Sequence, residues 1–349
     1  MMSVETLPSV PSSWVDSHGT PRYGTYAGEL PEMSLAALGP SLSPGFPNAI
    51  LRRKRWHYTL IGTPEVLVVM AIADVGYAAN GFLAAVDLAA RSKLLDVSYL
   101  GLPGPLARVG DHPGPGLSAE IWGAGGHLRA RRPGANPRYQ VEADVLTLRS
   151  RYTKLRAEVL VAGGPPALTV ISPVAGGVVN VTQKHAGLLT FGSFEFKGRT
   201  YSLDGGVAGM DYSHGLLARH TAWRWAMGAG RLADGTPLGF NLVEGFNEGH
   251  ASANENALWV GGKVVPLGRA RFTFDRNDVL EPWAITTPDR EVDLRFRAFH
   301  VHRDMRDLKV IKSHFLQPLG VFRGSIVVGG QRLVIDDVPG VTEDQDMVW

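Results

Sequence analysis

Short runs of apolar residues, many alternating with polar ones, dominate the chain from residue 56 onward. Trp56–Ile61 and Glu65–Ala73 are two such runs, joined by a Gly-Thr-Pro turn, and they predict a pair of strands. The second run is apolar without a break from residue 66 to residue 73, so we expect that strand to be covered on both faces. Residues 83–95 are rich in alanine and could be helical, but strand–turn–strand is the interpretation we favour.

Further runs of the same kind recur about every ten residues, a spacing typical of a β-barrel or sandwich. In the second half, an Asp234-Gly235 turn predicts a hairpin between 221–229 and 238–246, because Asp-Gly supplies the positive φ that tight turns need. Residues 291–302 alternate, which places His300 and His302 on the buried face of their strand. Two Gly-Gly turns predict hairpins over 257–267 and 321–335.

These elements predict an all-β protein built from antiparallel strands. Residues 1–50 contain seven prolines and no sustained period, and we expect an irregular arm with one helical turn near 32–38. We place a first β domain at 51–205 and a second at 206–349. No glycine-rich phosphate loop lies between a strand and a helix, so the pattern does not favour a nucleotide-binding fold.

Composition and charge narrow the class of protein. The 349 residues carry a formal charge of +2, and this balance argues against a dedicated nucleic-acid binder. The chain contains no cysteine, which excludes disulfides, thiolate nucleophiles and thiolate-bound metals. No run of apolar residues approaches the ~20 needed for a membrane span, and no secretory signal is visible at the N-terminus. We expect a soluble, cytoplasmic protein, monomeric or homodimeric, with neither metal nor cofactor.

One stretch, residues 209–248, gathers acid–base groups and aromatic side chains. Trp223 and Trp225 are two apart on a strand, so both indoles face the same way. Most of the polar groups fall at predicted strand ends, where the mouth of a barrel would bring them together. We take Asp211, His214 and Glu244 as candidate catalytic residues, and as candidate binding residues Arg219, His220, Trp223, Trp225, Asn241, Asn247 and Glu248.

The sequence of this stretch resembles the domain-of-unknown-function 2804 family. The resemblance is carried by Asp-Tyr-Ser-His-Gly at 211–215, Arg-His-Thr-Ala-Trp-Arg-Trp-Ala at 219–226 and Gly-Arg-Leu-Ala-Asp-Gly-Thr at 230–236. It is more distantly similar to the lipocalin-like superfamily of carotenoid 1,2-hydratases, tocopherol cyclases and related pericyclases. That similarity rests on Asp211, Gly215, Trp223, Trp225, Asp234 and Gly235. The resemblance implies two lipocalin-like β-barrel or half-barrel domains packed together, with a ligand cavity near their junction. The hydratases add water across an isoprenoid double bond with an acidic residue, and Asp211 is the position that aligns with such an acid.

The chemistry of these residue types agrees with that expectation. Protonating an alkene without a cofactor needs a carboxylic acid kept neutral by desolvation, together with aromatic faces that stabilise a carbocation. Asp211 beside the two tryptophans could supply both. Alternatively, Asp211 caps a turn or pairs with Arg219, and the indoles fill a core.

Three function hypotheses follow. The first is a hydratase, dehydratase or cyclase that acts on a mostly apolar or amphipathic small molecule such as a terpenoid or lipid. The second is a non-catalytic carrier for such a ligand. The third is a carbohydrate-active hydrolase that uses Asp211 with Glu244 or Glu248.

Four weaker signals complete the sequence picture. A metal site of His214, His220, His300 and His302 is a minor alternative, since no helical His-Glu-X-X-His accompanies them. Lys184 is expected to be a solvated lysine, with binding of a carboxylate or phosphate as the alternative. The basic run 52–55 is expected to be a solvated strand entrance, with a nucleic-acid or membrane contact as the alternative. The acidic segment 343–346 is expected to be exposed, with Trp349 tucking back.

Overall fold

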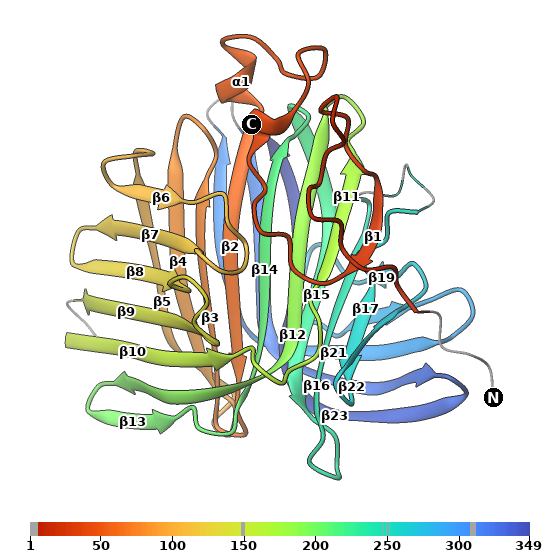
Figure 1. Cartoon of the computed structure of the whole chain (residues 1–349). Helices are drawn as coiled ribbons and strands as arrows, with labels where there is room; N and C mark the ends of the chain where they lie inside the picture. Colours follow the sequence, from red (N-terminus) through yellow and green to blue (C-terminus); the bar gives the residue numbers. More distant parts are fainter. Residues whose placement is uncertain (1–5, 148–150, 247, 249, 251, 308–311) are drawn as a thin grey trace.

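In the computed structural model, two antiparallel sheets pack against each other (Figure 1). The structure describes residues 6–147, 151–246, 248, 250, 252–307 and 312–349. The first sheet curls into a nearly closed barrel and the second into a half-barrel, which confirms the all-β, two-domain expectation. In the described part of the chain, helix is limited to the short turns η1 (Leu35–Ala37) and α1 (Asn48–Leu51). None of its helices is long and apolar enough to cross a membrane.

The first sheet is ordered β5 (Ser92–Gly101), β4 (Ala79–Asp87), β3 (Val66–Asp74), β2 (Arg53–Gly62), β14 (Val207–Leu216), β12 (Val179–Phe196), β10 (Arg151–Leu160), β9 (Arg138–Thr147), β8 (Gly126–Arg131), β7 (Ser118–Gly123) and β6 (Ala107–Val109). Off this path, β11 (Leu168–Pro173) pairs with β12 and with β1 (Gly24–Ala27) of the N-terminal arm, and β13 (Arg199–Ser202) pairs with β12. Residues 83–95 therefore form strand–turn–strand, as the sequence favoured.

The second sheet is ordered β18 (Lys263–Pro266), β17 (Ala257–Val260), β16 (Pro237–Glu244), β15 (His220–Arg231), β23 (Gln331–Val348), β22 (Lys312–Val328), β21 (Val292–Asp307), β20 (Trp283–Thr286) and β19 (Arg271–Thr273). The Asp-Gly hairpin is β15–β16, with Gly235 at a φ of 85°. From the sequence we place the domain border at 205/206, before β14. Because β14 belongs to the first sheet, the chain changes sheets after this strand, between Leu216 and His220.

Four hydrophobic cores hold the described part of the chain together. One fills the barrel, one fills the half-barrel, a third lies between the two sheets, and a small fourth core packs β11 and β12 against β17. Strand β3 shows why its sequence is apolar at consecutive positions: Val66 and Val68 face the barrel core, while Leu67 faces the core between the sheets. Both faces of this strand are therefore covered, as the sequence predicted.

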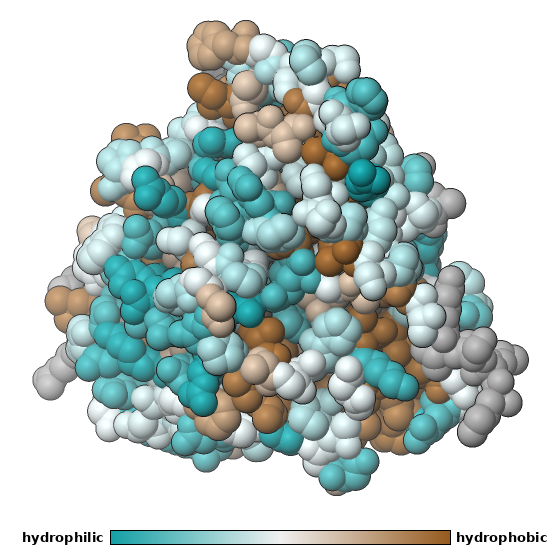
Figure 2. Space-filling view, viewed as in Figure 1, coloured by the Kyte–Doolittle hydropathy of each residue, from teal (hydrophilic) through white to brown (hydrophobic). Residues whose placement is uncertain are grey.

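The surface is mainly hydrophilic on the face drawn in Figure 2. Apolar residues are exposed at the top of this face, over α1 (Figure 2). Phe46, Ile50 and Leu51 are among the exposed large hydrophobic residues of the described chain.

Candidate functional site

A cavity of about 150 Å³ lies between the two sheets, next to the third core. Both domains contribute to its wall: Trp56 and Tyr58 come from β2, Asp211 from β14, and Trp223 from β15. An apolar cavity of about this size accommodates a benzene ring. The predicted meeting of the paired tryptophans and Asp211 therefore occurs at a real cavity.

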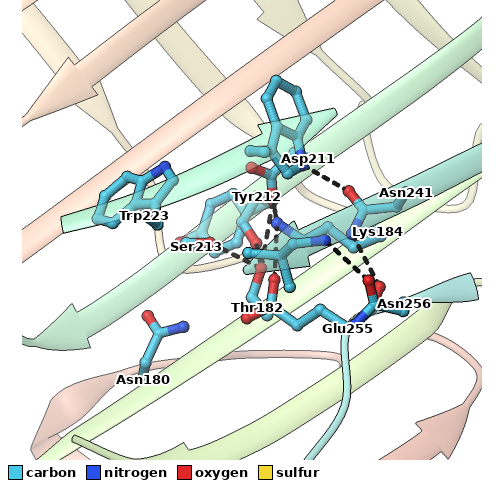
Figure 3. A network of polar contacts seen from close by, with 12 residues as sticks. Asn180, Thr182, Lys184, Asp211, Tyr212, Ser213, Trp223, Asn241, Glu255 and Asn256 are labelled. Carbon is cyan, nitrogen blue, oxygen red and sulfur yellow. Dashed lines mark hydrogen bonds and ion pairs between the residues drawn. The ribbon is translucent and has the colours of Figure 1, made fainter. Parts of the chain in front are cut away.

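A buried ion pair forms one wall of the cavity. Lys184 on β12 stands directly opposite Asp211 on β14 in the strand register, and its Nζ lies 2.6 Å from Asp211 Oδ1. Trp56 Nε1 donates to Asp211 Oδ2 at 3.0 Å. Thr182 Oγ1 donates to Oδ1 at 3.2 Å (Figure 3). Asp211 is thus held by three donors, an arrangement that suits a carboxylate.

Lys184 also contacts a second carboxylate, Glu255 Oε2, at 3.2 Å. Only 3% of the lysine is exposed. Burial alone would lower the pKa of Lys184, but the charges of Asp211 and Glu255 outweigh it and raise the pKa above its usual value. The prediction that Lys184 is solvated is therefore wrong. Its ammonium group is buried and pairs with two carboxylates that come from separate segments of the chain.

Glu343 on β23 is a further acidic group of the cavity wall. Trp223 Nε1 donates to its Oε1 at 2.7 Å, and Gln317 Nε2 donates to its Oε2 at 2.9 Å. Desolvation by burial raises the pKa of Glu343 to about 7, although these two hydrogen bonds oppose the rise and nearby Asp211 adds to it. At neutral pH a large share of this carboxyl group is protonated, so it can donate a proton.

Aromatic rings surround these polar groups. The indoles of Trp56 and Trp223 are stacked, with centroids 6.1 Å apart, and the ring of Tyr58 meets Trp225 edge to face at 5.1 Å. Trp225 Nε1 donates to Asn241 Oδ1 at 2.7 Å, and Asn241 in turn donates to the carbonyl oxygen of Glu255 at 2.8 Å. The last contact connects the paired tryptophans to the segment that holds Lys184.

A histidine pair joins the sheets at another edge of the cavity. His300 Nε2 and His302 Nδ1 each lie 2.7 Å from one oxygen of Asp96 on β5. His302 lines the cavity and stacks on Phe82 of β4, with centroids 4.0 Å apart. Burial opposes ionisation of Asp96, but the two histidines lower its pKa below the usual value.

The structure separates several of the predicted site residues from this cavity. His214 lies on the opposite face of β14 from Asp211, near Asp111 and Arg55, where burial and Arg55 hold its pKa well below the usual value. Arg219 donates to the terminal carbonyl of Trp349 and is not the partner of Asp211. Asn247 lies outside the described residues.

The remaining candidates pair with surface groups. His220 is exposed and contacts Asp346 Oδ1 at 2.7 Å. Glu244 and Glu248 both contact Arg271, at 3.5 and 3.0 Å, away from the cavity lining. The four histidines considered for a metal site therefore lie at three separate places. Among the described residues, no three His, Cys, Asp or Glu side chains are grouped so that they could hold a metal ion.

Glu343 is not among the residues predicted for the site, because the segment 343–346 is expected from the sequence to be exposed. That expectation is wrong for Glu343, Asp344 and Gln345, which are 6%, 2% and 5% exposed. β23 extends to residue 348, and its last part lies between β15 and β22 instead of ending as a tail. Trp349 does tuck back, with its Nε1 donating to Thr221 Oγ1 at 2.8 Å.

The basic run before β2 also differs from expectation. Lys54 is fully buried, donates to the carbonyl of Val75 at 3.0 Å and lies over the rings of Tyr77 and Trp349. Burial lowers the pKa of Lys54 to about 7. The run is therefore part of the packing near the C-terminus and not a solvated strand entrance.

Fold and site together define a two-domain, antiparallel β protein with a cavity between its sheets that is lined by aromatic rings and a few charged groups. The chain belongs to the domain-of-unknown-function 2804 (DUF2804) family, whose model matches residues 9–349. No curated protein matches the chain.

Solved structures with a similar course of the chain share little sequence with it. A putative AttH from Nitrosomonas europaea is 13% identical, with a TM-score of 0.47 over 88% of this chain and 98% of that one. Kievitone hydratase from Nectria haematococca is 12% identical, with a TM-score of 0.48 over 99% and 98% of the two chains. CghA with Sch210972 is 10% identical, with a TM-score of 0.40 over 98% of each. At such identities and scores, the names of these neighbours carry nothing over to this chain.

Proposed function

We propose that this protein is a cofactor-free hydratase, dehydratase or cyclase that acts on a small amphipathic molecule in the cavity between its sheets. The observation that carries the proposal is Glu343, a buried carboxyl group with a pKa of about 7 in a cavity wall lined by aromatic rings. A general acid is most effective when its pKa lies near the working pH. The ligand is amphipathic because the wall combines these rings with charged groups.

The proposed hydration uses Glu343 as proton donor. Its proton and the π electrons of a substrate double bond form a new C–H bond, which leaves Glu343 ionised and the other carbon cationic. The faces of Trp223 and Trp225 stabilise that cation. Water then forms the C–O bond, and its spare proton passes to the Asp211 carboxylate. Asp211 releases that proton to solvent and Glu343 takes one up, which restores the starting state of both groups. The reverse sequence is a dehydration, and an internal nucleophile in place of water gives a cyclisation.

In this proposal Asp211 keeps a place in the reaction, but as acceptor of the proton that water releases. Its ion pair with Lys184 supports that role better than the donor role suggested by sequence alone. His214 and Glu244 have no role, because neither lines the cavity. The contacts of Glu244 and Glu248 with Arg271 likewise give no support to a carbohydrate-active pair with Asp211.

The proposal is tested by measuring whether the protein transfers deuterium from solvent to a carbon atom of the substrate. The full chain is incubated in D₂O with small amphipathic alkenes such as 4-hydroxystyrene, geraniol and cinnamyl alcohol, and the products are analysed by mass spectrometry. We expect addition of D₂O with one non-exchangeable C–D bond, and a rate about 10²- to 10⁴-fold lower in Glu343→Gln. Glu244→Gln, the same chemical change outside the cavity, should retain the wild-type rate.

Two results would contradict the proposal. Full turnover per folded molecule in Glu343→Gln would remove Glu343 from the reaction. Tight binding of these compounds with no chemical change in any of them would favour the carrier function, which uses the same cavity.

A further inference from the structure

Two buried amide side chains in the cavity wall have polar atoms without partners. Asn180 on β12 is 1% exposed, and neither its Nδ2 nor its Oδ1 has a hydrogen-bond partner among the described residues. Gln345 on β23 is 5% exposed, and its Nε2 is likewise unpartnered within the described chain. A buried polar group left unsatisfied loses its hydrogen bonds to water without replacement, so such groups call for an explanation.

The strand geometry aims Asn180 at the cavity. Asn180, Thr182 and Lys184 alternate along β12 and therefore share one face, and both Asn180 and Lys184 line the cavity. Thr182 and Lys184 belong to the network around Asp211, whereas Asn180 stands apart from it with no dashed line reaching it (Figure 3).

A glycine keeps the space beside Asn180 open. The residue opposite Asn180 on β14 is Gly215, and a Cβ there would come within 2.9 Å of Asn180 Oδ1. The amide is therefore accommodated by its neighbour strand without being bonded to it. Its free donor and acceptor are available to a molecule in the cavity.

We propose that Asn180, with Gln345 on the opposite sheet, binds a hydroxyl group of the ligand, so that the substrate class is a hydroxylated ring compound and not a hydrocarbon. A hydroxyl group can donate to Asn180 Oδ1 and accept from Nδ2, which satisfies both atoms at once. The rings of Tyr58, Phe82 and Trp225 line the same cavity and contact the apolar part. The inference rests on the proposed function in that it names the substrate class for the same cavity.

Phenol and toluene are the probes, because they differ only in a hydroxyl against a methyl group and a single ring fits the cavity volume. Calorimetric titration of the full chain should show phenol binding at least about tenfold more tightly than toluene, although an apolar site alone would prefer toluene. In Asn180→Leu, which is similar in size and has no polar atoms, this preference should disappear. Asn277→Leu, the same change at an exposed asparagine, should keep it.

Asn180→Asp covers the case in which Asn180→Leu does not fold. It retains the shape and the acceptor but loses the donor, so it should still bind phenol and lose affinity for benzaldehyde, whose oxygen only accepts. Equal binding of phenol and toluene by the wild-type chain would overturn the inference. So would an unchanged preference in Asn180→Leu, or unchanged benzaldehyde affinity in Asn180→Asp.

The proposed hydroxyl-binding subsite and the proposed role of Glu343 can be contradicted independently of each other. Glu343→Gln should still prefer phenol to toluene, whatever happens to its turnover. A normal phenol preference with full turnover in Glu343→Gln would contradict the catalytic proposal alone. Loss of deuterium incorporation in Glu343→Gln with no phenol preference in the wild type would contradict the subsite alone.

Discussion

The indole nitrogen of Trp223 donates a hydrogen bond to Glu343 Oε1 at 2.7 Å, from one strand of the second sheet to its neighbour. Gln317 donates to the other carboxyl oxygen, and Tyr58 of the first sheet donates to Gln317 Oε1 at 3.2 Å. These contacts hold Glu343, an acid of the second domain, in the cavity wall. The ion pair of Lys184 and Asp211 in the same wall belongs to the first domain. The site therefore depends on both domains.

The raised pKa of Glu343 predicts how stability depends on pH. The pKa increases from 4.5 to about 7 on folding, so the folded state favours the protonated form. The stabilisation is complete below the unfolded pKa and is lost as the pH rises through the folded value. Between about pH 5 and pH 8 the free energy of unfolding of the wild type should fall relative to Glu343→Gln by on the order of 3 kcal/mol. Urea unfolding at each pH measures this difference.

The control for this prediction is Glu244→Gln, which makes the same change at a half-buried surface carboxyl. Its unfolding curves show how much of the pH dependence comes from removing a carboxyl group outside the cavity. Parallel curves for the wild type and Glu343→Gln would show that the carboxyl group of Glu343 is not desolvated.

Replacing Trp223 should move the titration of Glu343. The Nε1–H group stabilises the ionised carboxylate, so Trp223→Phe should raise the pKa of Glu343 further. The basic limb of the activity profile should then shift to higher pH. Trp225→Phe is the matched control, because Trp225 bonds to Asn241 and not to Glu343, and it should leave the limb in place. Equal shifts in both variants would assign the effect to altered packing.

The buried ion pair predicts unequal costs for its members. Lys184→Met leaves Asp211 and Glu255 buried without their shared cation, so the free energy of unfolding should fall by about 3–5 kcal/mol. Asp211→Asn should cost less, since Glu255 still faces the ammonium group. Exposed Lys312, paired with Asp307, provides the comparison, and Lys312→Met should cost no more than about 1 kcal/mol. A Lys184→Met variant as stable as Lys312→Met would contradict the buried pair.

Asp96 should contribute to the contact between the domains. Asp96→Asn weakens its charged hydrogen bonds with His300 and His302, and we expect a loss of about 3 kcal/mol in urea unfolding. Asp293→Asn, at a half-exposed aspartate paired with Arg290 on the surface, should have little effect. An unchanged unfolding midpoint in Asp96→Asn would show that the contact of Asp96 with the two histidines does not stabilise the junction of the sheets.

The elements that the sequence predicted are those with local signals. The Asp234-Gly235 turn and the alternation around it identify the β15–β16 hairpin, and the two-residue spacing of Trp223 and Trp225 places both indoles in the cavity wall. These features depend on neighbours in the chain, which a single sequence displays.

The chemistry of Glu343 and Lys184 could not be predicted in the same way. Charged residues are usually solvated, and what buries these two comes from distant segments: residue 343 bonds to Trp223, and residue 184 pairs with Asp211 and Glu255. The one signal in the sequence for a buried strand here is the apolar run at the start of β23. Because this run ends before the segment 343–346, it does not predict that the segment is buried. Only the pairing of β23 with β15 on one side and β22 on the other shows that this segment is buried.

The most direct measurement of the central claim is the titration of Glu343 itself. Protein labelled with ¹³C at the glutamate carboxyl carbons is titrated by NMR, and the resonance absent from Glu343→Gln is assigned to Glu343. A proton donor in the cavity predicts a midpoint near pH 7. A midpoint near the ordinary glutamate value of about 4.3 would mean that Glu343 is ionised at neutral pH and cannot be the acid.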